Sequence, residues 1–145
     1  MQQIIKKAFE IANNFDVKTN PNSAVLYSIS FMPNEDNKTK ALAYLKEHKF
    51  AQILDTTLCG KALIDLGLNS KVNEASVDIN NIWKIASSRF IKYASGNIIA
   101  FVDGADERST FYTTELVEIL KNPNITTINE IDKHIFFKTF IPQKY

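Results

Sequence analysis

Residues 80–104 read NNIWKIASSRFIKYASGNIIAFVDG. Asn80 or Asn81 can cap a helix here, and Gly96 stands where such a helix typically ends. Residues 97–102 are then almost continuously apolar, as in a buried parallel strand. A helix followed directly by a buried strand indicates an α/β fold. Apolar side chains recur through the helical part with a helical period, at Ile82, Trp83, Ile85, Ala86, Phe90 and Ala94.

Apolar patterning predicts further elements on both sides of this stretch. Residues 3–15 and 39–49 have helical periods, and residues 24–29 form a short apolar run that favours a strand. Another apolar segment lies between Gly60 and Gly67. The first half is therefore expected to be mostly helical.

The second half is expected to begin with a polar connection over residues 71–80. After the strand at 97–102 we expect extended segments over residues 110–117 and 125–131, followed by a final apolar segment over 135–141. The two halves would form lobes of approximately residues 1–70 and 71–145.

Length and composition indicate one folded domain over residues 1–145. Apolar residues make up 45% of the chain and charged residues 23%, which excludes collagen-like, coiled-coil and wholly disordered chains. The net charge is +1, from 17 Lys plus Arg and 16 Asp plus Glu. A protein that binds nucleic acid by neutralising phosphates carries a basic stripe, so we do not expect a nucleic-acid partner.

Few residues of the chain suit a metal ion or a disulfide. Cys59 is the single cysteine, and His48 and His134 have no ligand partner at helical spacing. We therefore expect no metal site. No apolar run approaches the ~20 residues that cross a bilayer, and residues 1–15 do not resemble a signal peptide.

The second half also combines an indole, hydroxyls and a carboxylate in a distinctive order. Trp83 is followed after three residues by Ser87 and then by Arg89-Phe90. Beyond the apolar strand, residues 109–115 read STFYTTE and end in Glu115. This order and spacing resemble the ADP-ribosyl cyclase and NAD glycohydrolase family.

Two segments of the first half extend the resemblance. Residues 24–28, AVLYS, look like the family's apolar strand ending in Trp-Ser, and residues 54–60, LDTTLCG, look like its Leu-Glu-x-Thr-x-x-Gly segment. Tyr27 stands where the family usually has Trp, and Asp55 where it usually has Glu. The disulfides of the animal members are absent, which fits a relative of bacterial type.

The resemblance implies a fold and an activity. The fold would be two-lobed, with a helical N-terminal lobe, a small parallel-sheet C-terminal lobe and the site between them. The activity would be an NAD glycohydrolase that releases nicotinamide and ADP-ribose, with cyclic ADP-ribose as a minor product. NAD would be the substrate, and no cofactor is expected.

The resemblance also implies a biological setting. Small bacterial chains of this kind resemble the toxin domain of a competition system, with a cognate immunity protein as partner. Such a domain would be secreted or delivered as part of a larger protein and would act in the cytoplasm of the target cell.

The implied catalytic residue is Glu115. Breaking the bond between nicotinamide and ribose leaves positive charge on the sugar, which a nearby carboxylate stabilises. Trp83 and Tyr27 would hold the flat cationic nicotinamide ring by stacking and cation–π attraction. Asp55 would accept a hydrogen bond from the carboxamide group.

The diphosphate of NAD requires hydrogen-bond donors. We expect these from the hydroxyls of Ser28, Ser87 and Thr110 and from the backbone near Phe111. Arg89 would add a charge-assisted contact.

Residue type alone also allows a structural interpretation of each candidate. Trp83 lies on the apolar stripe of its helix and suits a core position, and Asp55 suits a cap for a helix through residues 56–59. Glu115 and Arg89 suit solvated or ion-paired surface positions. The hydroxyls of Ser28, Ser87 and Thr110 suit caps and turns.

Two other functions are also compatible with the sequence. A protein-directed ADP-ribosyltransferase would also use a glutamate at the same glycosidic bond but would transfer label from NAD to protein. A non-catalytic nucleotide-binding domain would keep the fold and bind without turnover.

Overall fold

The computed structural model describes residues 2–28, 36–68, 77–105 and 109–141. Two short segments accompany the regular elements, a 3₁₀ turn over Leu54–Thr56 and a π-helical segment over Phe111–Glu115. The described helices are α1 (Gln2–Asn14), α2 (Asn37–Glu47), α3 (Leu58–Asp65), α4 (Val77–Lys92), α5 (Leu116–Lys121) and α6 (Lys133–Thr139). The described strands are β1 (Val25–Tyr27), β2 (Gly96–Phe101), β3 (Ile125–Ile128) and β4 (Ile131–Asp132).

The four strands form one sheet in the order β1-β2-β3-β4. β1, β2 and β3 are parallel, and β4 pairs antiparallel with β3. The mixed α/β architecture confirms the predicted α/β fold. The sheet is mixed where a parallel one was expected, and its first strand comes from the first half of the chain.

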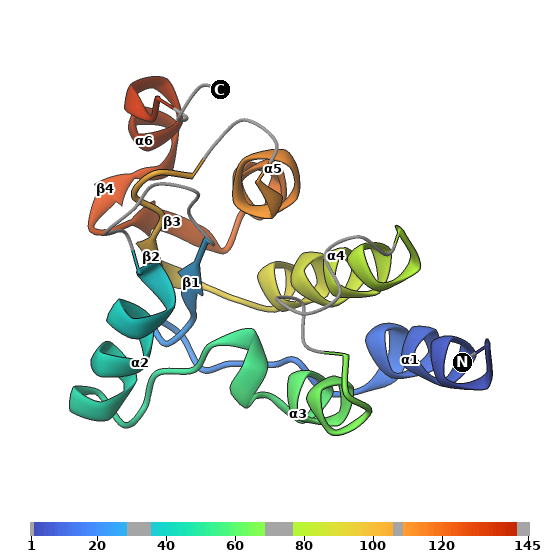
Figure 1. The fold of residues 1–145 in the computed structure, drawn as a ribbon. Helices are drawn as coiled ribbons and strands as arrows, with labels where there is room; N and C mark the ends of the chain where they lie inside the picture. The colour runs from blue at the N-terminus through green and yellow to red at the C-terminus, as the bar shows by residue number, and fades with distance from the viewer. Residues whose placement is uncertain (1, 29–35, 69–76, 106–108, 142–145) are drawn as a thin grey trace.

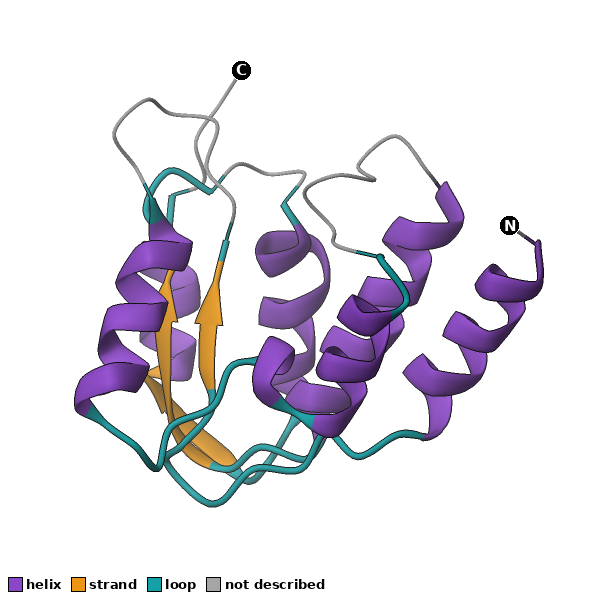
Figure 2. Ribbon diagram, turned by 60° about the horizontal axis from the view of Figure 1, so that its bottom comes forward, coloured by secondary structure: helices purple, strands orange, loops and turns teal. Residues whose placement is uncertain are grey.

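Side chains of the sheet face two separate hydrophobic clusters. Leu26 and its register partner Ala100 belong to a large core, whereas Val25 and its partner Ile99 pack with Ala41 of α2 in a smaller one. This alternation follows from the two-residue repeat of a strand. Figures 1 and 2 show the resulting layers, with α2 on one side of the strands and α4 and α5 on the other.

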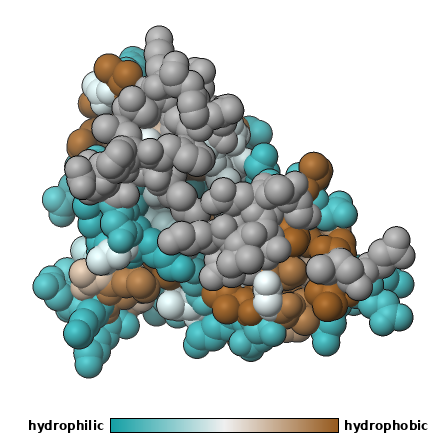
Figure 3. All heavy atoms as spheres, in the orientation of Figure 1, coloured by the Kyte–Doolittle hydropathy of each residue, from teal (hydrophilic) through white to brown (hydrophobic). Residues whose placement is uncertain are grey.

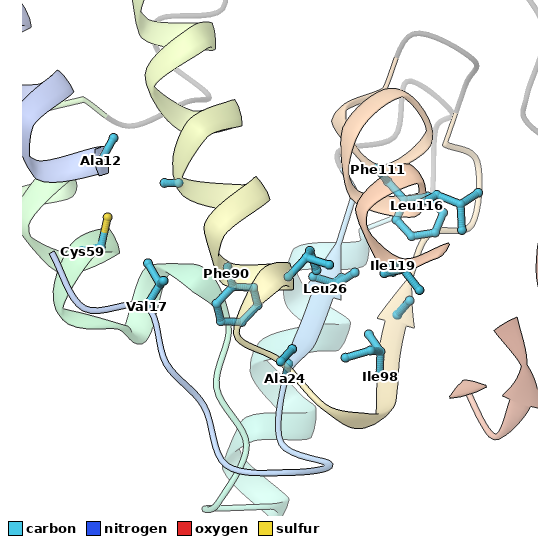
Figure 4. Packing of buried hydrophobic residues seen from close by; sticks show 14 of the residues in the cluster. Ala12, Val17, Ala24, Leu26, Cys59, Phe90, Ile98, Phe111, Leu116 and Ile119 are labelled. Carbon is cyan, nitrogen blue, oxygen red and sulfur yellow. The ribbon is translucent and has the colours of Figure 1, made fainter. Parts of the chain in front are cut away.

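The large core is centred on α4. In Figure 4, Phe90 of α4 lies between Val17 on one side and Leu26 of β1 on the other. Phe90 is fully buried, as are Ile82 of the same helix and Ile98 of β2. Burying side chains of this size contributes roughly 1.5–3 kcal/mol each, so this contact fixes α4 against the sheet.

The two halves of the chain are interleaved. α4, from the second half, packs against α1 and shares a core with α3, while β1 and α2, from the first half, pack against β2. Figure 1 shows α1, α3 and α4 as one group and the sheet with α2, α5 and α6 as another. The division into lobes near residue 70 stays a prediction.

Residues 110–117 were expected to be extended, and this prediction is wrong. They continue into α5 as a helix, with Ser109 accepting a hydrogen bond from the backbone N–H of Tyr112 at its start. Thr, Tyr and Phe favour strands locally, but burial of Phe111, Leu116 and Ile119 on one helical face outweighs that preference.

Other boundaries differ for similar local reasons. The extended segment 125–131 is two strands, because Asn129 and Glu130 have positive φ angles and make a tight turn. The final segment is α6, capped by Asp132, whose carboxylate accepts from the backbone of His134 and Ile135.

The ends of two further predicted elements also shift. α4 begins at Val77, ahead of the expected caps Asn80 and Asn81. Of the expected connection over 71–80, residues 71–76 lie outside the described residues, as does Ile29 of the predicted strand.

Some apolar surface stays exposed. Figure 3 shows apolar side chains gathered over the group formed by α1, α3 and α4, and Leu58 and Ile64 of α3 are among the exposed ones. Among the described residues, no helix combines the length and the apolar character that crossing a bilayer requires.

The segment LDTTLCG requires a glycine at position 60 for steric reasons. The Thr57 hydroxyl caps α3 by accepting from the Gly60 N–H at 3.1 Å, and the same hydroxyl donates to the Leu54 carbonyl at 2.6 Å. A Cβ on residue 60 would overlap the Leu54 carbonyl oxygen. Glycine thus allows the 3₁₀ turn that carries Asp55 to rest directly on α3.

Gly60→Ala is expected to lower the free energy of unfolding by about 1–3 kcal/mol, because the added methyl group forces this turn away from α3. Urea unfolding followed by circular dichroism measures the change. The control is Gly67→Asn, since a Cβ there would meet no atom within 4 Å and asparagine tolerates the φ of +82°. Equal stability of Gly60→Ala and the unsubstituted chain would contradict the packing described here.

Candidate functional site

The candidate site lies at the carboxyl ends of β1 and β2. Tyr27 is the last residue of β1, and Ser28 follows it, with its backbone N–H donating to the Phe101 carbonyl at 3.0 Å. Ligands of open α/β sheets bind at this edge, because parallel strands leave their carboxyl ends side by side there. The structure therefore places the AVLYS segment where a ligand is expected.

Tyr27 and Asp55 form a direct pair. The Tyr27 hydroxyl donates to Oδ2 of Asp55 at 3.0 Å. Burial, the Asp55 charge and this hydrogen bond all raise the pKa of Tyr27 far above its usual value, and the Glu115 charge adds to the effect. The phenol is therefore a fixed neutral donor, and Asp55 keeps Oδ1 as a further acceptor.

Glu115 and Ser87 form a second pair. Glu115 ends the π-helical segment and is 8% exposed. Burial raises the pKa of Glu115 from its ordinary 4.5 to about 7, and the hydrogen bond with Ser87 acts in the opposite direction. Because the Glu115 charge also acts on Tyr27, both pairs belong to one electrostatic environment.

Trp83 lies one helical turn before Ser87 on the same face of α4. Its indole Nε1–H donates to the Leu68 carbonyl at 2.7 Å, and its half-buried ring packs against the large core. The hydrogen bond fixes the plane of the ring, which is what a stacking surface requires.

Thr110 and Phe111 occupy the first turn that leads to Glu115. Thr110 is exposed, and its hydroxyl makes no capping hydrogen bond. The Phe111 ring is buried against Phe136 and Phe140, with centroids 6.2 and 5.5 Å away. Only the backbone of Phe111 is therefore suited to contact a ligand. Its N–H is suited to this role because the N–H groups of a first helical turn have no acceptor within the helix.

Arg89 is not brought to this group. Its guanidinium donates to the Ala12 carbonyl at the end of α1 at 2.7 Å and also hydrogen-bonds Cys59 of α3. It lies two residues beyond Ser87, which places it on a different face of α4. This geometry gives Arg89 a structural role, joining α1 and α3 to α4.

The geometry decides between the structural and the functional interpretation of several residues. Thr57, and not Asp55, caps α3. Glu115 is buried, which differs from the solvated position that its residue type also allowed. The Ser87 hydroxyl forms a hydrogen bond with Glu115. Trp83 has both a core contact and a fixed indole N–H.

Two residues of this neighbourhood were not predicted. Lys38 Nζ lies 4.0 Å from Oδ2 of Asp55. Asn37 donates from Nδ2 to the Ser28 and Asp103 carbonyls, both at 2.8 Å. Their position soon after a predicted strand is the signal in the sequence, but nothing in the polar run around them distinguishes them from turn residues.

Metal ligands do not gather in the described part of the chain. Within it, no group of three or more His, Cys, Asp or Glu side chains could hold an ion.

Similarity to known proteins is found among solved structures. No family model matches the sequence, and no curated protein matches it. Among solved structures, porcine CD38 bound to a covalent intermediate, ribo-F-ribose-5′-phosphate, matches with a TM-score of 0.55 and 20% identity, over 87% of this chain and 67% of that one. Apo porcine CD38 matches with a TM-score of 0.51 and 19% identity, over 87% and 66%.

A second group of matches consists of cyclases. Aplysia cyclase with its substrate NGD and product cGDPR matches with a TM-score of 0.55 and 17% identity, over 87% of this chain and 62% of that one. The chain thus spans about two thirds of the length of these proteins. The mixed α/β fold of this chain is similar to the fold of ADP-ribosyl cyclases.

The buried carboxylate makes a prediction about pH and stability. The pKa of Glu115 in the folded chain, about 7, exceeds that in the unfolded chain, so folded protein binds this proton more tightly. The contribution to stability is present at low pH and is lost as pH rises through 7, by about 3 kcal/mol at most. Glu115→Gln carries no such charge, so its stability relative to the unsubstituted chain should rise between pH 5 and 8.

Urea unfolding at several pH values measures this difference. The control is Glu118→Gln on α5, which removes a carboxylate from the same helix and leaves Glu115 in place. A difference between Glu115→Gln and the unsubstituted chain that stays constant from pH 5 to 8 would contradict the burial of an ionisable carboxyl.

Proposed function

We propose that this chain is an NAD glycohydrolase, which cleaves NAD to nicotinamide and ADP-ribose with some cyclic ADP-ribose. The observation that carries the proposal is the buried carboxyl group of Glu115. Burial raises its pKa to about 7, and the Ser87 hydrogen bond acts in the opposite direction. No Lys, Arg or His among the described residues contributes to this shift. A desolvated carboxylate of this kind is suited to stabilise positive charge that develops on a substrate.

In the proposed reaction, Glu115 faces the ribose carbon that bears nicotinamide. The C1′–N bond breaks, and its electron pair goes to the ring nitrogen, so nicotinamide leaves as a neutral molecule. Water then adds to C1′ and loses a proton, which gives ADP-ribose. Because positive charge nearby favours the ionised form of a carboxyl, the bound pyridinium would lower the pKa of Glu115 and ready it for the reaction.

Nicotinamide recognition is assigned to Tyr27, Trp83 and Asp55. The two rings offer flat faces held by hydrogen bonds to Asp55 and to the Leu68 carbonyl. Asp55 would accept the carboxamide N–H at Oδ1, because Oδ2 already accepts from Tyr27.

The diphosphate contacts are assigned to the Ser28 and Thr110 hydroxyls and to the backbone at Phe111. The Ser28 N–H already bonds Phe101, so its hydroxyl is the group proposed for phosphate. Ser87 is reassigned to orienting Glu115, which it hydrogen-bonds.

Nicotinamide release from NAD by the purified chain tests this proposal. Glu115→Gln is expected to reduce turnover by at least about 100-fold, since it removes the charge that stabilises the transition state. Chromatography of the products separates ADP-ribose from cyclic ADP-ribose. No release by the folded, unsubstituted chain would rule out the hydrolase, NAD binding without release would favour a binding domain, and label transferred to protein would favour an ADP-ribosyltransferase.

The proposal extends to a toxin domain that depletes NAD in a competing cell and is neutralised by an immunity protein. This setting is supported by the resemblance to small bacterial chains alone. Producing the chain in a bacterial cytoplasm is then expected to lower cellular NAD and arrest growth, whereas Glu115→Gln produced at the same level leaves both unchanged. Normal growth and NAD content with active enzyme present would contradict this setting.

A further inference from the structure

Asn37 bridges the ends of two parallel strands. It is the first residue of α2 and is 2% exposed. Its Nδ2 donates at 2.8 Å to the carbonyl of Ser28, the residue after β1, and at 2.8 Å to the carbonyl of Asp103, two residues after β2. One amide therefore sets the separation of the two chain segments at the proposed site.

The same side chain keeps a buried oxygen without a partner. Both Nδ2 protons are used by carbonyls, so the orientation of the amide is defined: exchanging nitrogen and oxygen would set Oδ1 against two carbonyl oxygens. Oδ1 is buried and has no hydrogen-bond partner among the described residues, a condition it shares with Thr19 Oγ1 and Gln52 Oε1. Such a group typically costs about 1–3 kcal/mol. Of these three residues, Asn37 is the one whose side chain bonds the segments that follow β1 and β2, so its cost is tied to the proposed site.

Asn122 is a natural comparison within the chain. It is 7% exposed, and its Nδ2 donates to the carbonyls of Ile91 and Ala94 at the end of α4, at 2.8 and 3.0 Å. Its Oδ1 accepts from the Asn124 N–H at 2.8 Å, so this amide is satisfied on both sides. Asn124 bonds Gly96 at the start of β2, so Asn122 lies by the opposite edge of the sheet.

Asn37 is also linked to the nicotinamide-facing residues. Ser28, which it holds directly, follows Tyr27 in the chain. On its other side, Lys38 lies 4.0 Å from Asp55, which in turn accepts from Tyr27. Moving Asn37 would therefore disturb Tyr27 from both the strand and the helix.

We propose that Asn37 is a positioning residue, which holds Tyr27 and Ser28 in the arrangement that binds NAD. The proposal rests on the proposed function. It assigns Asn37 no contact with substrate; its effect passes through the two carbonyls and the start of α2.

The single tryptophan makes a direct binding assay possible, because Trp83 belongs to the proposed site. NAD is titrated against Glu115→Gln, and against Glu115→Gln combined with Asn37→Ala or with Asn122→Ala, while indole fluorescence is recorded. Asn37→Ala is expected to raise Kd by about tenfold or more, which corresponds to a loss of about 1.4 kcal/mol of binding free energy. Asn122→Ala is expected to lower Tm and leave Kd within about twofold.

Asn37→Asp provides a second variant in the same Glu115→Gln background. At pH 7 its carboxylate faces the Ser28 and Asp103 carbonyls and should weaken NAD binding. Burial against two carbonyl oxygens raises the pKa of this carboxyl above its ordinary value. At pH 5 more of it is therefore protonated and can donate one hydrogen bond, so Kd should move toward the Asn37 value, a recovery that Asn37→Ala cannot show.

The outcomes separate the two proposals. Equal Kd values for the Asn37 and Asn122 variants, or no recovery of Asn37→Asp at low pH, would overturn the positioning role and leave the hydrolase proposal intact. If the unsubstituted chain neither releases nicotinamide nor responds to NAD, the proposed function fails, and the role of Asn37 fails with it.

Discussion

The parallel pairing of β1 with β2 is the contact on which the rest of the structure depends. It joins residues 25–27 to residues 99–101, far apart in the sequence. The pairing gives the sheet two buried faces, one covered by α2 and the other by α4 and α5. It also sets Tyr27 beside the segment that leads to Glu115, so the candidate site exists only where these strands end.

Two buried groups that are costly for stability lie at this edge of the sheet. Glu115 is a buried carboxyl with a raised pKa, and the Asn37 oxygen is buried without a partner in the part of the chain that the structure describes. Asn122 and Lys133, away from the site, are buried and satisfied, and the Lys133 Nζ donates to the Asn122 carbonyl at 2.7 Å, whereas Thr19 Oγ1 and Gln52 Oε1 have no partner among the described residues. A buried carboxyl with a raised pKa close to other perturbed groups is typical of a site shaped by ligand binding.

Residues in one motif have separate tasks in the folded chain. Ser87 and Arg89 are two positions apart, yet Ser87 bonds Glu115 while Arg89 joins α4 to α1 and α3. Gly60 contributes no chemistry, but its missing side chain lets the turn with Asp55 rest on α3. The spacing of the motifs therefore reflects packing as much as recognition.

Local patterns were sufficient where a segment's own side chains determine its structure. The helical period before residue 94 and the apolar run after Gly96 predicted α4 and β2, because both patterns are strong and punctuated by a glycine. The motif spacing likewise singled out Trp83 and Glu115. It did not predict the helix over 110–121, because β-branched and aromatic residues favour strands until Phe111 and Ile119 meet the core.

The sequence by itself thus determined the α/β class, most helices and the candidate carboxylate. Only the tertiary structure decided which groups meet: Tyr27 with Asp55, Ser87 with Glu115, and Arg89 with the Ala12 carbonyl. The physical reason is that these hydrogen bonds join segments far apart in the chain. The packing of α4 against the sheet determines these partners, and local periodicity in the sequence contains no information about that packing.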